Sequence, residues 1–296
     1  MLVIRLEILD IISPMKARCS YKAVELPAKR GEAAAILAKW KQEGALGGVT
    51  TWGSGIAHRD GLRLYWLGDK LPEELSGAAE TLIEEDWTPH WQGALSRVRV
   101  SAGVTLTPAW LAEEGISQGV DIILDPGMAF GAGDHPTTRM CSRTLEQIAH
   151  GGFPDVSVLD VGAGTGVLSI LAAKLGAKAV DALDIDPFCH ASCERNIALN
   201  GVEDKVSPRL LSLDLLHGEY GLVIANIVAG QLAHLAPEII SHLAPGGKVL
   251  LSGFKEDKAS EVAEYFYPLS ERGRLIEEGW CALTMERMEK VKKEDV

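Results

Sequence analysis

The amino-acid sequence predicts an α/β protein: a Rossmann-like sheet with helices on both faces, preceded by a small α+β domain. Two patterns lead to this prediction. From residue 157 onward, short β-rich runs alternate with helical runs, as in the right-handed βαβ units that build a parallel sheet. Before residue 87, strand-like and helical runs follow the mixed order of a small α+β domain. With 296 residues the chain has room for two domains, which we expect at 1–86 and 87–296.

The N-terminal domain is expected to contain strands and two helices. Apolar runs predict strands at residues 2–9, 48–52 and 63–67, and helical patterns fall at 31–43 and 72–86. Every tryptophan except Trp280 precedes residue 111. We interpret these tryptophans as the core of the small domain and its contact with the next one, with a recognition surface as the alternative.

The second domain is expected to alternate regularly between strands and helices. Strands are predicted at 157–161, 179–185, 206–213, 222–227 and 248–252. Helices fall between and after them at 165–175, 187–199, 229–243 and 256–265, and a hairpin at 273–286 follows. This order predicts a mainly parallel sheet.

Charge and composition limit the function classes. A formal net charge of −12 argues against direct nucleic-acid binding, which depends on Lys and Arg, and favours a basic protein partner. The sequence has no apolar run of the roughly 20 residues that a membrane span needs and no signal-peptide pattern at its start. Five cysteines without a CxxC pair are expected to be free thiols in a cytoplasmic protein, and no metal site is predicted.

A glycine-rich turn at residues 158–166 is the sharpest local signal. Gly162, Gly164 and Gly166 allow the backbone to approach a ligand closely where a strand runs into a helix, which is typical of a nucleotide site. Val167 stands where the dinucleotide fingerprint needs glycine or alanine, which weakens a nicotinamide-dependent oxidoreductase. Asp160 completes the D-x-G-x-G-x-G pattern of class I S-adenosylmethionine methyltransferases, where it would hold the amino end of the methionine directly or through water. A turn that only closes a βα corner is the alternative.

Further polar residues stand at the predicted strand ends. Asp184 follows Gly162 at about the spacing of a ribose-binding acid, whereas Asp186 is expected to cap the next helix. Asp214 is either a partner for the adenine amino group or a solvent-facing turn residue. Asn226 is the catalytic candidate, because its amide oxygen can accept a hydrogen bond from a substrate amine and orient the nitrogen lone pair. A structural asparagine with satisfied hydrogen bonds is the alternative.

Three segments together, 125–138, 158–166 and 225–227, resemble the bacterial ribosomal protein methyltransferases of the PrmA type. The resemblance runs from about residue 85 to residue 287. It implies a class I methyltransferase fold, S-adenosylmethionine as cofactor, and lysine ε-amines and an N-terminal α-amine of a large-subunit ribosomal protein as acceptors. It also implies that the N-terminal domain holds the substrate protein. Cofactor contacts would come from Thr138, Gly162, Asp184 and Asn226, with Phe130 and the loop 131–135 closing over the site.

Two positions in that loop depart from the family pattern. Ala132 and Asp134 stand where threonine or another uncharged residue is usual. Asp134 is expected either to cap the following helix or to pair with an incoming ammonium group. His135 is a candidate proton acceptor, with a structural role as the alternative. These changes leave room for the same methyl transfer to a different protein.

Overall fold

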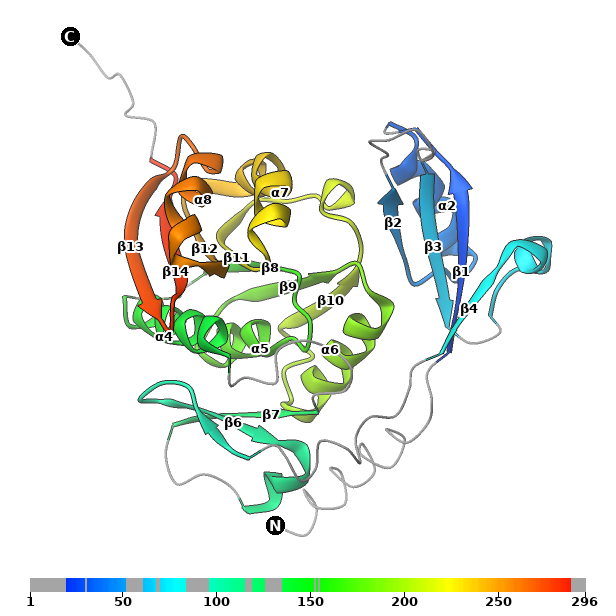
Figure 1. Ribbon diagram of the computed structural model, residues 1–296. Helices are drawn as coiled ribbons and strands as arrows, with labels where there is room; N and C mark the ends of the chain where they lie inside the picture. Colours follow the sequence, from blue (N-terminus) through cyan, green and yellow to red (C-terminus); the bar gives the residue numbers. More distant parts are fainter. Residues whose placement is uncertain are drawn as a thin grey trace.

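The N-terminal part of the chain forms a four-stranded sheet with one helix (Figure 1). The computed structural model describes residues 20–29, 31–51, 61–67, 70–83, 96–114, 119–125, 135–151, 153 and 155–288. In the sheet the strands lie in the order β2-β3-β1-β4, all antiparallel. The elements are β1 (Ser20–Pro27), α2 (Ala33–Gln42), β2 (Gly47–Thr51), β3 (Gly61–Leu67), the 3-10 helix η2 (Glu73–Ala78) and β4 (Glu80–Ile83).

The predictions for this region are partly right. β2, β3 and α2 confirm the runs near 48–52, 63–67 and 31–43. The helix predicted at 72–86 is wrong, because η2 ends at Ala78 and the chain then pairs as β4 with β1. The strand predicted at 2–9 and the boundary at 86/87 lie outside the described residues.

Tryptophans form part of the core beneath this sheet. Trp40 of α2 and Trp66 of β3 are buried, and their rings meet edge to face with centroids 6.0 Å apart. Leu37, Leu62 and Leu64 complete the packing. The core role proposed for the tryptophans is therefore confirmed for these two residues, whereas Trp110 is only half-buried. Trp52, Trp87 and Trp91 lie outside the described residues.

A seven-stranded sheet forms the centre of the molecule, in the order β10-β9-β8-β11-β12-β14-β13. The strands from β10 to β12 are parallel, and β14 pairs antiparallel with both β12 and β13. The strands are β8 (Ser157–Val161), β9 (Ala179–Asp184), β10 (Val206–Leu210), β11 (Tyr220–Asn226), β12 (Leu243–Lys255), β13 (Ser270–Glu277) and β14 (Trp280–Glu286). All five predicted strands and the hairpin are present, with β10 shorter and β12 longer than predicted.

Helices cover both faces of this sheet (Figure 1). One face carries α4 (Pro136–His150), α5 (Val167–Lys174) and α6 (Pro187–Leu199), and the other carries α7 (Ala229–Ser241) and α8 (Ala259–Tyr265). Alternation along the strands supplies both cores, since Val158 and Leu222 pack on the first face and Leu159 and Val223 on the second. The predicted fold class is therefore confirmed.

Residues 96–124 form a third, smaller sheet that the sequence did not indicate. It consists of β5 (Val98–Arg99), β6 (Val104–Pro108) and β7 (Val120–Leu124), with the 3-10 helix η3 (Ala109–Glu114) between the last two. Asn200, the C-cap of α6, accepts from the backbone N–H of Ile123 and donates to its carbonyl. Its side-chain amide thus makes the two hydrogen bonds that a paired strand would make with this residue. This sheet thus leads the chain to Asp125, which directly precedes residues 126–134.

The N-terminal sheet meets the large sheet at the edge strand β10. Gly48 forms a parallel bridge with Leu211, and the backbone N–H of Ser212 donates to the Gly48 carbonyl at 3.3 Å. One hydrophobic core runs through both parts, because Leu211 and Leu213 pack with Leu62 and Leu64. This junction places strand β2 at the carboxyl ends of the parallel strands. In the described part of the chain, no helix is long and apolar enough to cross a bilayer.

Candidate active site

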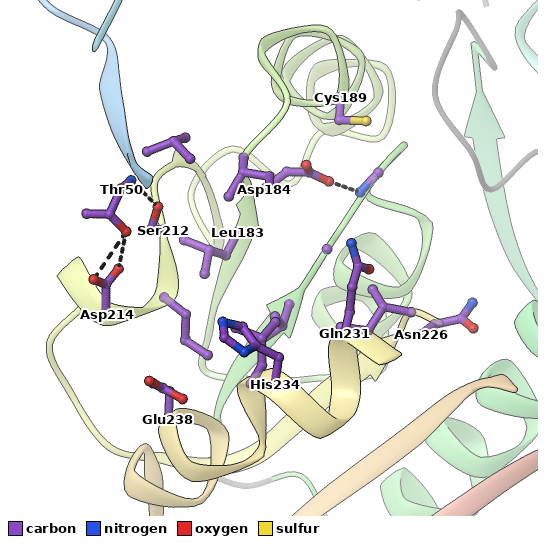
Figure 2. Close-up of a pocket in the computed structure, with 18 of the residues that line it drawn as sticks. Thr50, Leu183, Asp184, Cys189, Ser212, Asp214, Asn226, Gln231, His234 and Glu238 are labelled. Atoms are coloured by element: carbon purple, nitrogen blue, oxygen red, sulfur yellow. Dashed lines mark hydrogen bonds between the residues drawn. The ribbon is translucent and has the colours of Figure 1, made fainter. Parts of the chain in front are cut away.

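A cavity of about 650 Å³ lies at the carboxyl ends of β8, β9, β10 and β11 (Figure 2). In an open parallel sheet this is the edge where ligands bind. The lining comes from four strand ends, from helix α7 and from strand β2 of the N-terminal sheet. It includes Gly162, Gly164, Asp184, Asp214, Asn226, Gln231, His234, Glu238, Val49 and Thr50.

The glycine turn after β8 forms one wall of the cavity. Gly162 has φ 73°, and a Cβ there would lie 2.6 Å from Cγ2 of Ile227. Gly166 has φ 79°, and a Cβ there would lie 2.6 Å from the Sγ of Cys193. Side chains at either position would therefore clash with the strand or helix behind them, and φ itself favours glycine. The turn can pack this tightly and still present its backbone to a ligand.

Asp184 is held rigidly at the end of β9. Its Oδ2 accepts from the backbone N–H of Gly164 at 2.9 Å, and its Oδ1 accepts from that of Asp186 at 3.0 Å. Burial raises the pKa of Asp184, and these backbone hydrogen bonds oppose the rise. Each carboxylate oxygen has a second lone pair, so the fixed side chain can accept two hydroxyl groups of a ribose. Asp186 caps α6 by accepting from the N–H of Phe188, as predicted.

Asn226 ends β11, beside the glycine turn. Its Oδ1 is buried and has no hydrogen-bond partner among the described residues. In Figure 2 the side chain lies on the opposite side of the cavity from Thr50 and Asp214. The site therefore has two separate polar ends, one at Asn226 and one at Asp214, with the Asp184 carboxylate as a third polar group.

Asp160 lies behind the glycine turn and does not line the cavity. Its side chain is 2% exposed, and its Oδ2 accepts from the Ser169 hydroxyl at 2.6 Å. Burial raises the pKa of Asp160 to about 6 against the lowering effect of the Ser169 hydrogen bond. Of the two routes predicted for this carboxylate, the placement favours contact through water over direct contact with a ligand.

Thr138 and His135 belong to the start of α4, and neither is part of the cavity lining. Thr138 is fully buried, and its Oγ1 has no partner among the described residues. His135 is the N-cap of α4, where its Nδ1 accepts from the backbone N–H of Thr137 at 3.3 Å. The cap expected from Asp134 is therefore made by His135. Phe130, Ala132 and Asp134 lie outside the described residues.

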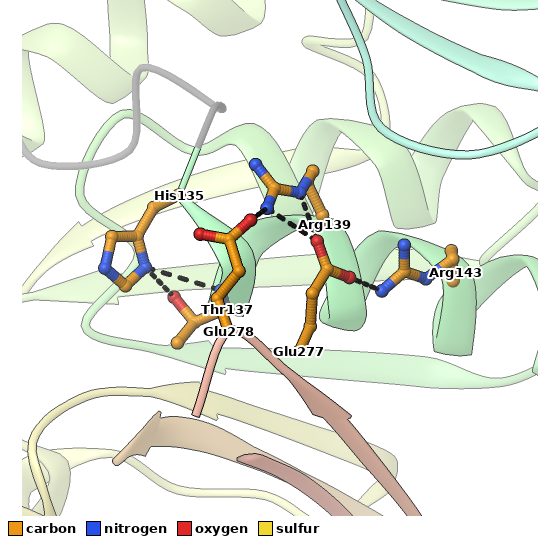
Figure 3. A network of polar contacts seen from close by, with 6 residues as sticks. All are labelled: His135, Thr137, Arg139, Arg143, Glu277 and Glu278. Atoms are coloured by element: carbon orange, nitrogen blue, oxygen red, sulfur yellow. Dashed lines mark hydrogen bonds and ion pairs between the residues drawn. The ribbon is translucent and has the colours of Figure 1, made fainter. Parts of the chain in front are cut away.

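A polar cluster fixes the start of α4 against the β13–β14 hairpin (Figure 3). Arg139 bonds to Glu277 and Glu278, and Arg143 bonds to the other oxygen of Glu277. Burial alone would raise the pKa of Glu277, but the hydrogen bonds and charges of Arg143 and Arg139 together lower it. The His135 ring also packs edge to face on Trp280, with centroids 4.6 Å apart.

Several residues at the site were missed by the sequence interpretation. Asn196 of α6 accepts from the Asp125 N–H at 2.7 Å and donates to the Thr165 carbonyl at 2.9 Å, which ties Asp125 to the glycine turn. The spacing of Asn196 and Asn200, one helical turn apart, could have indicated them. No sequence pattern indicated Val49 and Thr50, because their position at the cavity depends on how the N-terminal sheet meets the large sheet.

Comparison with known proteins decides the family. A sequence model described as ribosomal protein L11 methyltransferase (PrmA) matches residues 66–288. The chain belongs to the ribosomal protein L11 methyltransferase family. A member from Geobacter sp. (strain M21) is 42% identical over 208 residues, covering 69% of this chain and 67% of the relative. A member from Trichlorobacter lovleyi is 38% identical and covers 70% of both chains.

A solved structure supports the same assignment. The crystal structure of a ribosomal protein L11 methylase from Lactobacillus delbrueckii subsp. bulgaricus is 30% identical, with a TM-score of 0.59. It covers 66% of this chain and 100% of its own. As a PrmA family member the chain is a class I methyltransferase, with S-adenosylmethionine as cofactor. Membership also decides against the nicotinamide-dependent oxidoreductase.

The residues that line the cavity are suited to S-adenosylmethionine. The glycine turn leaves backbone close to the cavity, and carboxylates stand at the ends of the two neighbouring strands β9 and β10. The unpartnered Oδ1 of Asn226 lies at the opposite end. Among the described residues no group of His, Cys, Asp and Glu could hold a metal ion.

The thiol of Cys189 also lines the cavity. Burial, followed by the Asp184 and Asp186 carboxylates, raises the pKa of this thiol. It is therefore protonated at neutral pH, which suits a wall residue and not a nucleophile. Cys193 lies on the same helix as a buried free thiol.

Proposed function

We propose that this chain transfers methyl groups to lysine ε-amines, and to an N-terminal α-amine, of the large-subunit ribosomal protein L11. The proposal rests above all on the buried, unpartnered Oδ1 of Asn226 at the end of a central strand. An acceptor in that position suits an incoming amine, which brings N–H donors. The substrate protein is the one after which the family and its relatives are named.

The cofactor would be held along the strand ends. Asp184 would accept the two ribose hydroxyls and Asp214 the adenine amino group, with Gly162, Gly164 and Gly166 keeping the backbone close. Asp160, through water, and Thr138 would hold the methionine end, and Phe130 with the loop 131–135 would close over it. Thr138 supports this role because its buried hydroxyl has no partner among the described residues.

The reaction is a direct in-line transfer, and the bound cofactor supplies an electrophilic methyl group on a sulfonium. Asn226 accepts a hydrogen bond from the amine and thereby points the nitrogen lone pair at that methyl group, which is a proximity effect. The new bond would join nitrogen and carbon, the broken bond would leave its electron pair on sulfur, and the proton that the ammonium loses before the attack would pass to solvent water.

The amine must be neutral before it can attack. Holding an ordinary lysine neutral at pH 7 costs about 5 kcal/mol, and a water-poor site lowers that cost. His135 was a candidate for accepting the proton. Its Nδ1 accepts from the backbone N–H of Thr137, so in the neutral ring Nε2 carries the hydrogen and has no lone pair for a further proton. The capping role is therefore the one that the contacts support.

The substrate protein would be recognised by the N-terminal part of the chain, which we propose as the recognition domain (1–86). The formal charge of −12 suits a basic protein partner and a cytoplasmic enzyme without direct contact to nucleic acid. A second candidate is the same chemistry on a different protein. Ala132 and Asp134 favour it, because they depart from the family pattern in the segment 125–138 that carries part of the resemblance.

Methyl transfer from labelled S-adenosylmethionine to purified ribosomal protein L11, read by mass spectrometry, tests the proposal. We expect methylated lysines with the wild-type chain and none with Asn226→Ala, while both proteins bind the cofactor. Binding without methylation of this substrate would favour the second candidate. An Asn226→Ala variant of full activity would remove the catalytic role of that residue.

A further inference from the structure

Strand β2 of the N-terminal sheet forms part of the cofactor cavity. Val49 and Thr50 line it together with Asp184, Asp214 and Asn226. The strand continues the large sheet where β10 ends, through the bridge between Gly48 and Leu211. A part of the chain that we assign to substrate recognition therefore also contributes to the opposite end of the cavity from Asn226.

Thr50 is fixed at this junction through both its backbone and its side chain. Its N–H donates to the Ser212 hydroxyl at 2.8 Å. Its own hydroxyl donates to the Asp214 carboxylate, with Oγ1 3.0 Å from Oδ1 and 3.2 Å from Oδ2 (Figure 2). Because threonine is stiff at χ1, the anchored backbone also fixes the direction of the hydroxyl.

The Thr50 hydroxyl helps to hold the Asp214 carboxylate in one orientation. Asp214 lies in the single 3-10 turn η4 (Leu213–Leu215) and is exposed, so little packing restrains its carboxylate. A carboxylate that is free to rotate loses conformational entropy when it binds a ligand, whereas one already oriented does not. The Thr50 hydroxyl provides that orientation from outside the β10 segment.

We propose that Thr50 is a positioning residue of the cofactor site: its hydroxyl orients the Asp214 carboxylate toward the adenine 6-amino group. Cofactor affinity then depends on the docking of the N-terminal sheet at β10. The inference rests on the proposed role of Asp214 at the adenine end.

Two ligands separate a positioning role from a merely structural one. S-adenosylhomocysteine carries the 6-amino group, and its analogue with hydrogen at that position does not. For the wild-type full-length chain, calorimetry should show about tenfold tighter binding of S-adenosylhomocysteine. Thr50→Val, which keeps the shape and removes the donor, should reduce that preference to about twofold and leave the affinity for the analogue unchanged. Thr50→Ser should restore it.

Each other outcome has a definite meaning. An equal loss of affinity for both ligands in Thr50→Val, or no loss at all, would overturn the positioning role. A wild-type chain without preference for the amino group would refute the adenine role of Asp214 and this inference with it. A wild-type chain that binds neither ligand would refute the proposed function itself.

Gly47 allows an independent test of docking. A Cβ built there would overlap with the backbone carbonyl oxygen of Leu210, which cannot move aside. Gly47→Ala should therefore lower the preference for the amino group as Thr50→Val does, and combining the two should add little. Gly77→Ala is the matched control, since nothing lies within 4 Å of a Cβ at that position in the same part of the chain. Wild-type preference in Gly47→Ala would contradict the dependence on docking.

Discussion

The Asn226 side chain keeps a buried oxygen for which the described residues provide no donor. An unsatisfied buried acceptor costs about 1 to 3 kcal/mol, so a folded chain seldom retains one without a ligand to fill it. The backbone of Asn226 is held by pairing with Ser252 of β12, and β8 pairs with β11 up to the preceding residue, Ala225. Activity and stability should therefore respond to its removal in different ways.

Replacing Asn226 by alanine should lower kcat by about a hundredfold or more, because the amine loses the group that orients it. Affinity for S-adenosylhomocysteine should change less than fivefold. The melting temperature should not fall, since the variant loses an unsatisfied acceptor. Single-turnover kinetics, calorimetry and thermal unfolding check these three points, and a large loss of affinity with unchanged kcat would contradict them.

Asp160 should make stability depend on pH. Its pKa is about 6 in the folded chain, against about 3.9 when unfolded. The folded state then holds the proton more tightly, so the free energy of unfolding falls as pH rises through this interval. As pH rises from about 4 to about 7, the free energy of unfolding of Asp160→Asn should increase relative to that of the wild type by on the order of 2 to 3 kcal/mol.

Urea unfolding across that pH range measures the effect of Asp160→Asn. Asp204→Asn, which removes an exposed carboxylate from the same domain, is the matched control and should follow the wild type. Parallel curves for wild type and Asp160→Asn would show that the buried carboxylate does not titrate in this interval.

Local spacing predicted the placement of some residues and could not predict others. Asp184 could be placed from its distance to Gly162, because both belong to one βαβ unit with a standard geometry. The partners of Asp160 and Asp214 come from α5 and β2, which approach only in the folded chain. No pattern around those two residues carries that information.

Among the elements, α4 depends on the β13–β14 hairpin for its position. The cluster of Arg139 and Arg143 with Glu277 and Glu278 connects the two at the end of the helix that carries Thr138. Fixing this helix also fixes the position of Thr138. The hairpin thus acts on the site without touching the cavity.

Glu277→Gln keeps the shape of the side chain and removes its charge. At pH 7 it should lower the free energy of unfolding by about 1 kcal/mol. The pKa of Glu277 is lowered in the folded chain, so this contribution is present above its unfolded pKa and disappears as pH falls through the folded value. Glu278→Gln, at a side chain that is 66% exposed, should cost less. Unfolding curves at neutral and acidic pH check both, and equal effects would contradict the central place of Glu277.

Helices and strands were predicted correctly where hydrophobic periodicity decides the structure. The prediction failed where the structure depends on pairing with a distant part of the chain. Every strand and helix predicted from residue 157 onward is present, since each buries a regular apolar pattern on one of two cores. Strand β4 forms instead of a helix because β1 offers it an open edge, and Ser76-Gly77 weakens the helical alternative. The edge of the sheet at 98–124 is paired by the side chain of Asn200, which stands 77 residues after its partner Ile123.

At the scale of the whole molecule, one core and one junction connect the N-terminal sheet with the site. Because both sheets line the cavity, a ligand bound there should stabilise the contact between them. By linkage, docking of the N-terminal sheet at β10 should in turn strengthen ligand binding. S-adenosylhomocysteine should therefore slow hydrogen exchange in residues 47–51 as well as in the glycine turn. Mass spectrometry of exchanged peptides measures these exchange rates. In Asp214→Ala, the ligand should no longer slow exchange in residues 47–51. Protection limited to the glycine turn would contradict the connection.

The junction at β10 also bears on self-association. The edge of a sheet exposes unpaired N–H and C=O groups that can recruit a strand from another molecule. Gly48 covers the carboxyl end of this edge, and further back Pro208 supplies no N–H while Arg209 adds a charge. At the opposite edge, β13 carries Glu271, Arg272 and Arg274. Both borders of the seven-stranded sheet are thus poor templates for another strand, which protects a large, mostly apolar sheet from aggregation.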